Sequence, residues 1–487
     1  MKRESTIIWV ATFLLIGVWI GSKFSPQQAS KDKLGQFFNY LQNEYVEKLD
    51  VDSLQAEAMN HILSSLDPHS TYIPVEEGAA MAERMQGGFS GVGVEFAIKK
   101  DSLVFVYVME NGPAAAAGVR SGDRVFAING DTIVGDQLTN TLITSKIKGP
   151  RATTVQLDIA RKGTLLTLNV QRDLVPISSV MSLPVDDGIG YIRVDRFAET
   201  THDEFVAHLH LLEQEGMKQL IIDLRDNPGG YLHEAVAMAD EFLSDNEIIV
   251  TTKYRNGTVN VSKAKSGQEF EKLPVSILIN ENSASASEVF TGALQDHDRA
   301  TVFGKLSYGK GLVQEDKRLQ DGSKVRLTVA YYFTPSGRSI QKPFRENQVV
   351  NEGVFLSDSG KVLYSGGGIE PDVSLGEDSV SYFWTFSFGT IDAFAFEYVD
   401  STRVQFENAA FEDFITEYTA DDALLGKFLE FGGYGIALDD LSASETKELR
   451  TLMQAAIAKN YWGFDAYRKV LLNGDPVLKE LIAQTLK

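Results

Sequence analysis

The period of the hydrophobic positions changes several times along this 487-residue chain. Between residues 34 and 86, apolar side chains recur at helical spacing, with Phe37, Leu41 and Tyr45 on one face, which predicts a helical segment. Residues 88–173 instead hold short alternating runs between glycine-rich turns, which is typical of a small, mostly β domain. We therefore expect a helical segment followed by a β domain.

The rest of the chain shows two further patterns. From residue 175 to 375, strand-like and helix-like stretches alternate, as in an α/β domain. Helical spacing returns in residues 378–487, for example at Phe411, Phe414 and Ile415. These helices either pack on the body of the protein or form a subunit interface, and the pattern leaves both open.

Ser285 lies where two of these patterns meet. The apolar run 274–280 predicts a buried strand, and residues 286–294 follow a helical pattern, so Ser285 lies on a strand-to-helix turn. Lys310 follows between two glycines, and Gln314 comes four residues later. This stretch offers a candidate nucleophile, a candidate base and an amide able to orient the base.

The three residue types fit acyl-transfer chemistry. A serine hydroxyl is a weak nucleophile until a base removes its proton. A lysine is that base only when neutral, and burial lowers its ordinary pKa of about 10.4. Gln314 can accept a hydrogen bond from the lysine without adding a charge that would favour the ammonium. The alternative is structural, because Ser285 to Glu288 also reads as an S-x-x-E capping box that begins an ordinary helix.

A glycine-rich turn precedes this stretch. Residues 223–230 read Asp-Leu-Arg-Asp-Asn-Pro-Gly-Gly and follow an apolar run that predicts a buried strand. Two glycines at a strand end let the main chain approach a ligand closely, whereas a plain surface turn is the alternative. The N–H groups that begin the helix after Ser285 suit the oxyanion of an acyl-transfer intermediate.

Taken together, these stretches resemble the carboxyl-terminal processing peptidases, a family of tail-specific serine proteases with a Ser–Lys dyad. The resemblance covers residues 35–375, and its motifs occur in the family's order: Leu-Asp-Pro-His-Ser at 66–70, Gly-Tyr-Ile-Arg at 190–193, the run 223–230, Ser-Ala-Ser-Ala-Ser-Glu at 283–288, Tyr-Gly-Lys-Gly at 308–311 and Thr-Pro-Ser-Gly-Arg at 334–338. The resemblance implies a nucleophile, a general base, a lysine-orienting residue and an oxyanion region, which are respectively Ser285, Lys310, Gln314, and Gly229 or Gly230 with Ala286.

Two positions depart from the family's pattern. Asn282 stands where the family often has glycine, and Leu312 stands where it often has serine or threonine. Neither change removes a catalytic group, but each could alter the local turn or the pocket wall.

The β segment resembles a PDZ domain. Residues 112–123 read Gly-Pro-Ala-Ala-Ala-Ala-Gly-Val-Arg-Ser-Gly-Asp, and Ile-Asn-Gly follows at 128–130. The resemblance implies that a peptide adds a strand to the sheet edge and that main-chain N–H groups bind its terminal carboxylate, at Gly91, Val92, Gly93 and Val94. Without the rest of the match, the glycines would only shape a hairpin.

The expected fold is an α/β protease core of the crotonase/ClpP-like type, with an inserted, mostly β PDZ domain, an N-terminal helical segment and a C-terminal α-helical extension. The crotonase-like core is implied by the resemblance alone. The expected domains are a signal anchor or signal peptide at 1–22, a tether and helical segment at 23–86, the PDZ domain at 87–174, the serine protease core at 175–377 and the helical extension at 378–487.

Composition narrows the function classes. A net charge of −21 and the absence of any basic block argue against a nucleic-acid partner. The chain has no cysteine, which excludes disulfides, a cysteine nucleophile and a lipid-modified cysteine anchor. No zinc-type ligand spacing occurs, and we expect the enzyme to need no cofactor.

The N-terminus predicts export. Lys2 and Arg3 precede an uncharged apolar run at 7–20, which fits a signal sequence and places the basic residues on the cytoplasmic side. No clear A-x-A cleavage site follows, so an uncleaved anchor is favoured over a cleaved signal peptide. We expect the body on the periplasmic side of the bacterial inner membrane, or secreted to the periplasm.

Rival functions fit less well. His297 lies about 18 Å along the predicted helix from Ser285, too far to act as its base. A catalytically inactive, PDZ-containing peptide-binding scaffold predicts loss of the serine, the lysine or the Gly-Gly turn, and all of these are present. An acyl-CoA enzyme of similar fold needs neither a PDZ segment nor a Ser–Lys pair. The expected partners are protein or peptide substrates with apolar C-terminal tails, together with homo-oligomers assembled through the helical termini.

Overall fold

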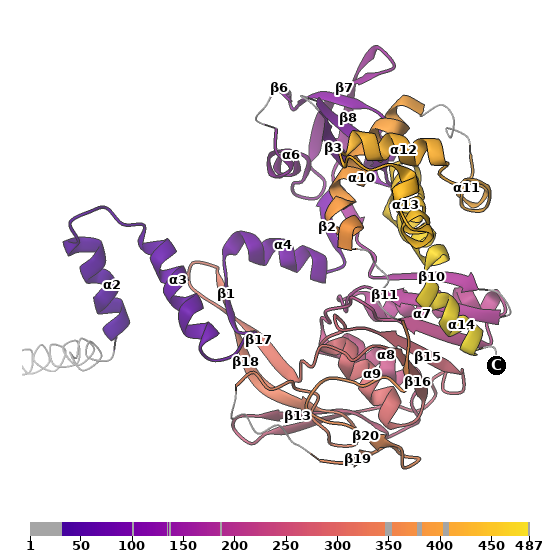
Figure 1. The fold of residues 1–487 in the computed structure, drawn as a ribbon. Helices are drawn as coiled ribbons and strands as arrows, with labels where there is room; N and C mark the ends of the chain where they lie inside the picture. The colour runs from indigo at the N-terminus through magenta and orange to yellow at the C-terminus, as the bar shows by residue number, and fades with distance from the viewer. Residues whose placement is uncertain are drawn as a thin grey trace, which may run out of the picture. The chain divides into compact units, whose positions relative to one another are not determined.

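The computed structural model describes residues 32–99, 102–133, 135, 138–185, 188–345, 353–376, 382–402 and 409–485 (Figure 1). The chain divides into two compact units, Met1–Val75 with Gln314–Thr328, and Glu76–Val313 with Val329–Lys487. The predicted signal anchor or signal peptide at 1–22 lies outside the described residues. None of the helices within the described ranges has the length and apolar character needed to cross a membrane.

The first unit begins with two helices, α2 (Lys33–Glu44) and α3 (Val51–Ser64), as the hydrophobic spacing predicted. Each begins after an aspartate, Asp32 or Asp50, whose carboxylate accepts a hydrogen bond from a main-chain N–H of the first turn. Helix α4 (Val75–Met85) completes the predicted N-terminal helical segment.

The predicted β domain is a single sheet in the order β3-β4-β5-β7-β8, with β6 paired to β5. Its elements are β3 (Val94–Lys99), β4 (Ser102–Val108), α5 (Pro113–Ala116), β5 (Arg124–Ile128), β6 (Asp131–Thr132), α6 (Asn140–Ile147), β7 (Thr154–Arg161) and β8 (Thr164–Gln171). Inward-facing side chains such as Leu103, Phe105 and Leu157 are fully buried and form its core. Strand β3 lies at the edge of this sheet.

Strands β2 (Gly88–Gly91) and β9 (Asp173–Pro176) frame this domain. They pair antiparallel, with Gly88 opposite Pro176, so the chain enters and leaves the β domain at neighbouring points. The domain is therefore an insertion, as the expected fold has it.

The α/β core is built on a six-stranded sheet in the order β10-β11-β12-β15-β16-β21. Strand β10 is antiparallel to β11, and the remaining neighbours are parallel. The strands are β10 (Val180–Val185), β11 (Ile189–Val194), β12 (Gln219–Asp223), β15 (Val275–Ile279), β16 (Ala300–Gly304) and β21 (Val373–Ser374).

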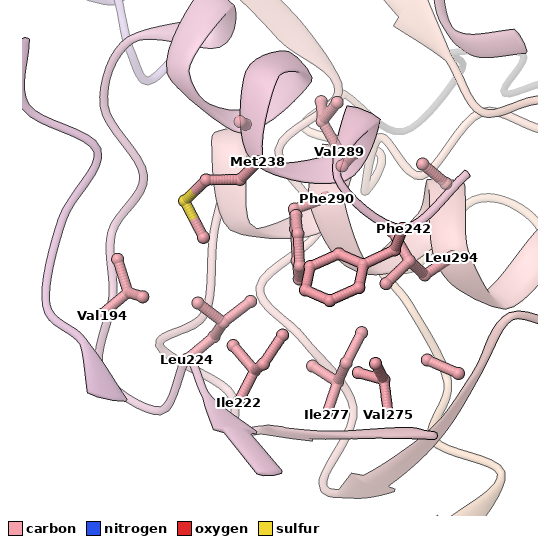
Figure 2. Close-up of a cluster of buried hydrophobic side chains, with 14 of the residues drawn as sticks. Val194, Ile222, Leu224, Met238, Phe242, Val275, Ile277, Val289, Phe290 and Leu294 are labelled. Atoms are coloured by element: carbon pink, nitrogen blue, oxygen red, sulfur yellow. The ribbon is translucent and has the colours of Figure 1, made fainter. Parts of the chain in front are cut away.

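Both faces of this sheet are buried, which explains why its parallel strands read as continuous apolar runs. On β15, Val275 and Ile277 face a cluster formed with helices α7 (Thr201–Gln214), α8 (Leu232–Asp240) and α9 (Ala286–Asp296). Figure 2 shows Ile222, Val275 and Ile277 beneath Phe242 and Phe290 in this cluster. On the opposite face, Leu278 packs with residues of the C-terminal helices.

A second sheet has the order β1-β18-β13-β14, with β17 paired to β18. Its strands all run antiparallel where their register is defined. They are β1 (Thr71–Ile73), β13 (Ile248–Tyr254), β14 (Val259–Lys263), β17 (Leu312–Arg318) and β18 (Lys324–Phe333), and a separate small hairpin consists of β19 (Phe355–Leu356) and β20 (Val362–Leu363).

The chain ends in a helical extension, as predicted. Its elements are α10 (Tyr382–Thr402), α11 (Phe411–Glu417), α12 (Asp422–Phe431), the 3-10 helix η4 (Leu438–Asp440), α13 (Ala443–Gly474) and α14 (Pro476–Thr485). Most of its apolar side chains form a hydrophobic cluster of their own. Leu472, Leu478 and Leu481 instead pack with Tyr191 and Leu278 of the core sheet.

Candidate active site

Ser285 lies on the predicted turn, between the end of β15 at Ile279 and the start of α9 at Ala286. Its main chain has φ 56° and ψ −112°, a region that residues with a side chain rarely adopt. Such a conformation persists only where the surrounding structure holds it, and it is a form of strain found often at functional sites.

Glu288, in the first turn of α9, holds this conformation. Its Oε2 accepts a hydrogen bond of 2.8 Å from the N–H of Ser285. The N–H of Glu288 in turn donates to the carbonyl oxygen of Ser285 at 2.9 Å. Only the Glu288 half of the predicted capping box is present, because within the described residues the Ser285 hydroxyl makes no capping hydrogen bond to the helix.

The same carboxylate also binds the lysine loop. Oε2 of Glu288 accepts a hydrogen bond of 2.9 Å from the N–H of Lys310. Its Oε1 accepts from the N–H of Gly309 at 2.7 Å and from the hydroxyl of Ser307 at 2.6 Å. The residue is 1% exposed, and burial raises the pKa of its carboxyl, although these hydrogen bonds oppose that shift. One buried carboxylate thus joins the Ser285 turn to the lysine loop.

Tyr332 makes a second connection between the same two residues. Its hydroxyl donates to the carbonyl oxygen of Ser285 at 3.0 Å and also contacts the carbonyl oxygen of Lys310. The ring is 2% exposed. Glu288 therefore binds the N–H groups of both Ser285 and Lys310, and Tyr332 contacts the carbonyl groups of both.

The sequence pattern identified Glu288 only as part of a helix cap and did not identify Tyr332. One signal was present, because Glu288 is the only charged residue between Asn282 and Gln295. A lone acid in an otherwise uncharged stretch indicates a buried carboxylate that needs several donors.

The Gly-Gly turn lies directly against Ser285. A Cβ atom at Gly229 would lie 2.9 Å from Ser285 Cβ, 2.9 Å from Ala286 N and 2.7 Å from Ala284 O. Its φ of 98° also favours glycine. The turn therefore makes a close approach to the main chain that carries the candidate nucleophile, whereas its predicted approach to a ligand stays a prediction.

The two glycines have different surroundings. The N–H of Gly229 donates to the side-chain oxygen of Asn227 at 2.8 Å. Gly230 pairs with Phe197, and a Cβ atom there would lie 2.1 Å from the Phe197 carbonyl oxygen. Ala286 is 2% exposed and begins α9, where helix N–H groups have no partner within the helix.

The two departures from the family's pattern have structural roles. Asn282 donates from Nδ2 to Asp226 Oδ1 at 2.9 Å, so it connects the loop before Ser285 to the loop before Gly229. Leu312 is 2% exposed and is part of the buried interior.

Gln314 is the first residue of the stretch that belongs to the first unit, whereas Ser285 and Lys310 belong to the second. Among the described residues, the buried Nε2 of Gln314 has no hydrogen-bond partner. A buried amide without an acceptor is costly, and this one can still make a hydrogen bond.

An ionic network lies behind the Gly-Gly turn. Asp223, at the end of β12, is fully buried and accepts hydrogen bonds from Arg225 Nη2 at 2.6 Å and from the Tyr191 hydroxyl at 2.7 Å. Burial alone would raise the pKa of Asp223, but Arg225 and Arg193 outweigh burial and lower it. This network fixes the strand end from which the turn begins.

The predicted carboxylate-binding residues lie at the start of the β domain. Gly91 ends β2, Val92 and Gly93 form the connection, and Val94 begins the edge strand β3. Gly93 has φ 75°, and its carbonyl oxygen accepts a hydrogen bond from Met109. These residues thus lead into the outermost strand of the sheet, and strand addition uses such a strand.

His297 follows α9 and binds elsewhere. Its Nδ1 contacts Asp358 Oδ2 and its Nε2 contacts the Ile248 carbonyl oxygen, both at 2.8 Å. In the described parts of the chain, potential metal-ligand atoms come together in two side-chain groups, one of His297 with Glu247 and Asp358 and one of His210, Glu213 and Glu269. In both groups the histidine pairs with acids at the surface, which needs no metal ion to explain it.

Residues 188–350 match the family described as Peptidase family S41, and residues 90–171 match the PDZ domain. Residues 385–463 match a family of unknown function (DUF8443). The chain is 33% identical over 348 residues to the carboxy-terminal processing protease CtpA of Bacillus subtilis (strain 168), covering 71% of this chain and 73% of that protein.

A second relative is the carboxy-terminal-processing protease of Bartonella bacilliformis, which is 37% identical over 315 residues, covering 63% of this chain and 72% of that protein. Among solved structures, the photosystem II D1 C-terminal processing protease is similar at 25% identity with a TM-score of 0.39, covering 70% of this chain and 86% of that one.

Proposed function

Because the chain belongs to peptidase family S41 and to its carboxy-terminal processing serine proteases, we propose that Ser285 and Lys310 form its catalytic dyad. The observation that carries this proposal is the pair of side chains shared by the two residues. Glu288 binds both N–H groups, and Tyr332 contacts both carbonyl groups. Such a connection fixes the separation of two main chains, as a nucleophile and its base require.

In the proposed reaction, Lys310 removes the proton of the Ser285 hydroxyl as the oxygen attacks the scissile carbonyl carbon. The N–H groups of Gly230 and Ala286 bind the oxyanion, and the close approach of Gly229 brings them near Ser285. Lys310 then gives its proton to the leaving amine, and water hydrolyses the acyl-enzyme by the same route. Gln314 orients Lys310 in the aligned site, using an amide that has no hydrogen-bond partner among the described residues.

We further propose that the β domain binds the substrate's C-terminal tail. The tail adds a strand to the edge of β3, and its carboxylate binds the N–H groups between Gly91 and Val94. Apolar terminal residues are the substrate ends that the family resemblance favours.

The proposed location is the periplasm, with residues 1–22 as an anchor or signal. Assembly through the helical termini is part of the same proposal. It is supported by α2, which buries none of its residues and exposes Leu34, Phe37 and Tyr40.

The dyad is tested with an unfolded substrate protein that ends in an apolar tail. Wild type should cleave it, and Ser285→Ala and Lys310→Ala should not. Two matched controls, Ser244→Ala and Lys317→Ala at exposed positions, should cleave at the wild-type rate. Equal cleavage by wild type and both dyad variants would contradict the proposal, and cleavage by none of the proteins would favour the peptide-binding scaffold.

A further inference from the structure

The helical extension contacts the strand that leads into the Gly-Gly turn. Between α13 and α14, Asp475 Oδ2 accepts a hydrogen bond from Arg225 Nη2 at 2.6 Å. The same guanidinium binds Asp223 at 2.6 Å. The Arg225 and Asp475 side chains are 16% and 15% exposed, so water screens this ion pair only in part.

A second ion pair connects the extension to the segment that follows β11, the strand next to β12. Arg468 of α13 binds Asp195 at 2.6 Å, and Asp195 accepts a hydrogen bond from Arg193 at 3.1 Å. Two residues after Asp195, the N–H of Phe197 donates to the Gly229 carbonyl oxygen at 3.0 Å. The extension is therefore connected to both main-chain segments that hold the turn.

Apolar packing fixes this end of the extension. Leu472, Leu478 and Leu481 share a buried cluster with Tyr191 and Ile221 of the core sheet. Tyr191 is also a hydrogen-bond partner of Asp223. A displacement of α13 would therefore be transmitted to Asp223 both through packing and through charge.

The same extension also contacts the β domain. Helix α13 has non-helical dihedral angles at Gly463, where a Cβ atom would lie 2.8 Å from the Tyr107 ring of β4. Helix α10 contributes Phe396 to a buried cluster with Val104 and Val106.

Polar contacts also join the extension to the β domain, and one of them involves the edge strand β3. Lys99, the last residue of β3, donates to the carbonyl oxygen of Ala393 at 3.1 Å. Arg124 of β5 binds Asp400 at 2.6 Å. The extension therefore contacts the strand that we propose to receive the substrate tail.

We propose that the C-terminal extension couples the β domain to the oxyanion turn, with Arg468 and Asp475 as positioning residues for the turn. This inference rests on the proposed function. Arg468 lies only about 7.5 Å along α13 from Gly463. A tail bound on β3 would shift the sheet whose strand β4 contacts Gly463. Helix α13 would then shift the ion pairs that the extension makes with Asp195 and Arg225.

The test compares a short peptide with the same peptide joined to an apolar C-terminal tail, each assayed for kcat and KM. Wild type should cleave the tailed peptide faster. Asp475→Asn and Arg468→Gln should lose about 10-fold in kcat on the tailed peptide, since a 1 Å error in positioning costs up to about 100-fold. Their KM and their affinity for the isolated tail should stay at the wild-type value, and Arg468→Lys should recover part of the loss.

Asp422→Asn is the matched control, because it breaks an ion pair with Arg450 that lies within the extension itself. It should leave the tailed rate unchanged. Gly463→Ala would place a methyl group against the Tyr107 ring and so disturb the contact between α13 and the β domain. It should reduce the stimulation of cleavage by the tail, while the short peptide is cleaved at the wild-type rate. A kcat within twofold of wild type for Asp475→Asn, Arg468→Gln and Gly463→Ala would overturn the coupling. Cleavage of the peptides by Ser285→Ala at the wild-type rate would overturn the proposed function instead.

Discussion

Replacement of Glu288 by glutamine tests the shared carboxylate most directly. In the wild type, four donors meet two carboxylate oxygens, with Ser285 and Lys310 on one oxygen and Ser307 and Gly309 on the other. Glutamine keeps the shape but offers one oxygen and one NH2 group. In either orientation two buried donors lose their acceptor and face another donor.

The size of the effect follows from that count. Each buried donor without an acceptor costs about 1–3 kcal/mol. With two such donors, Glu288→Gln should lower the free energy of local opening around Ser285 by about 2–6 kcal/mol. Loosening of Ser285 against Lys310 should also lower kcat by about 100-fold, as expected for an error of about 1 Å in positioning. KM should change little, because Glu288 is buried beneath the main chain.

The assay combines peptidase kinetics with amide hydrogen exchange of residues 283–311. Hydrogen exchange reports local opening in a chain of several domains, where a global unfolding free energy is poorly defined. Glu281→Gln is the matched control, because Glu281 is exposed and near the same turn. The shared carboxylate has no such role if Glu288→Gln changes exchange protection by less than about 10-fold, or about 1.4 kcal/mol, and kcat by less than twofold.

Three further predictions concern the same unit of the chain. Gly229→Ala should lower kcat by about 100-fold or more without unfolding the protein, as checked by kinetics and circular dichroism, because its Cβ would displace the proposed oxyanion donors. Tyr332→Phe should lower the free energy of local opening by about 1 kcal/mol in hydrogen exchange of residues 283–311, since the Ser285 carbonyl loses a donor. Burial disfavours the charged form of His297, but hydrogen bonds to Asp358 and to a carbonyl oxygen outweigh burial and raise its pKa above 6.5. The protonated ring should therefore add stability in full below pH 6.5 and lose it as the pH rises through the raised pKa, and Asp358→Asn should reduce both the NMR-measured pKa and the stability gain at pH 6 relative to pH 8.

Much of the fold could be read from periodicity. The apolar run before Ser285 is a buried strand, the stretch after it is a helix, and the strands between residues 94 and 171 form a β sheet. These features depend on neighbours in sequence, so local patterns are enough to predict them.

The connections between distant segments could not be read in this way. The bond of Glu288 to the N–H of Ser285 lies within three positions of sequence, but nothing local shows that Gly309 and Lys310 share the same carboxylate. Asp475 meets Arg225 across 250 positions. Such contacts depend on how the elements pack, and hydrophobic spacing carries no information about that.

Asn280, Asn282 and Asp226 have a consequence for how this site can change during evolution. Oδ1 of Asp226 accepts hydrogen bonds from both asparagine amides at 2.9 Å, and the N–H of Asp226 donates to Asn280 at 2.9 Å. Asp226 also has φ 62°, which aspartate and asparagine tolerate better than most residues. Loss of Asp226 would leave two amides without their acceptor, so the three positions should be exchanged together among related chains rather than one at a time.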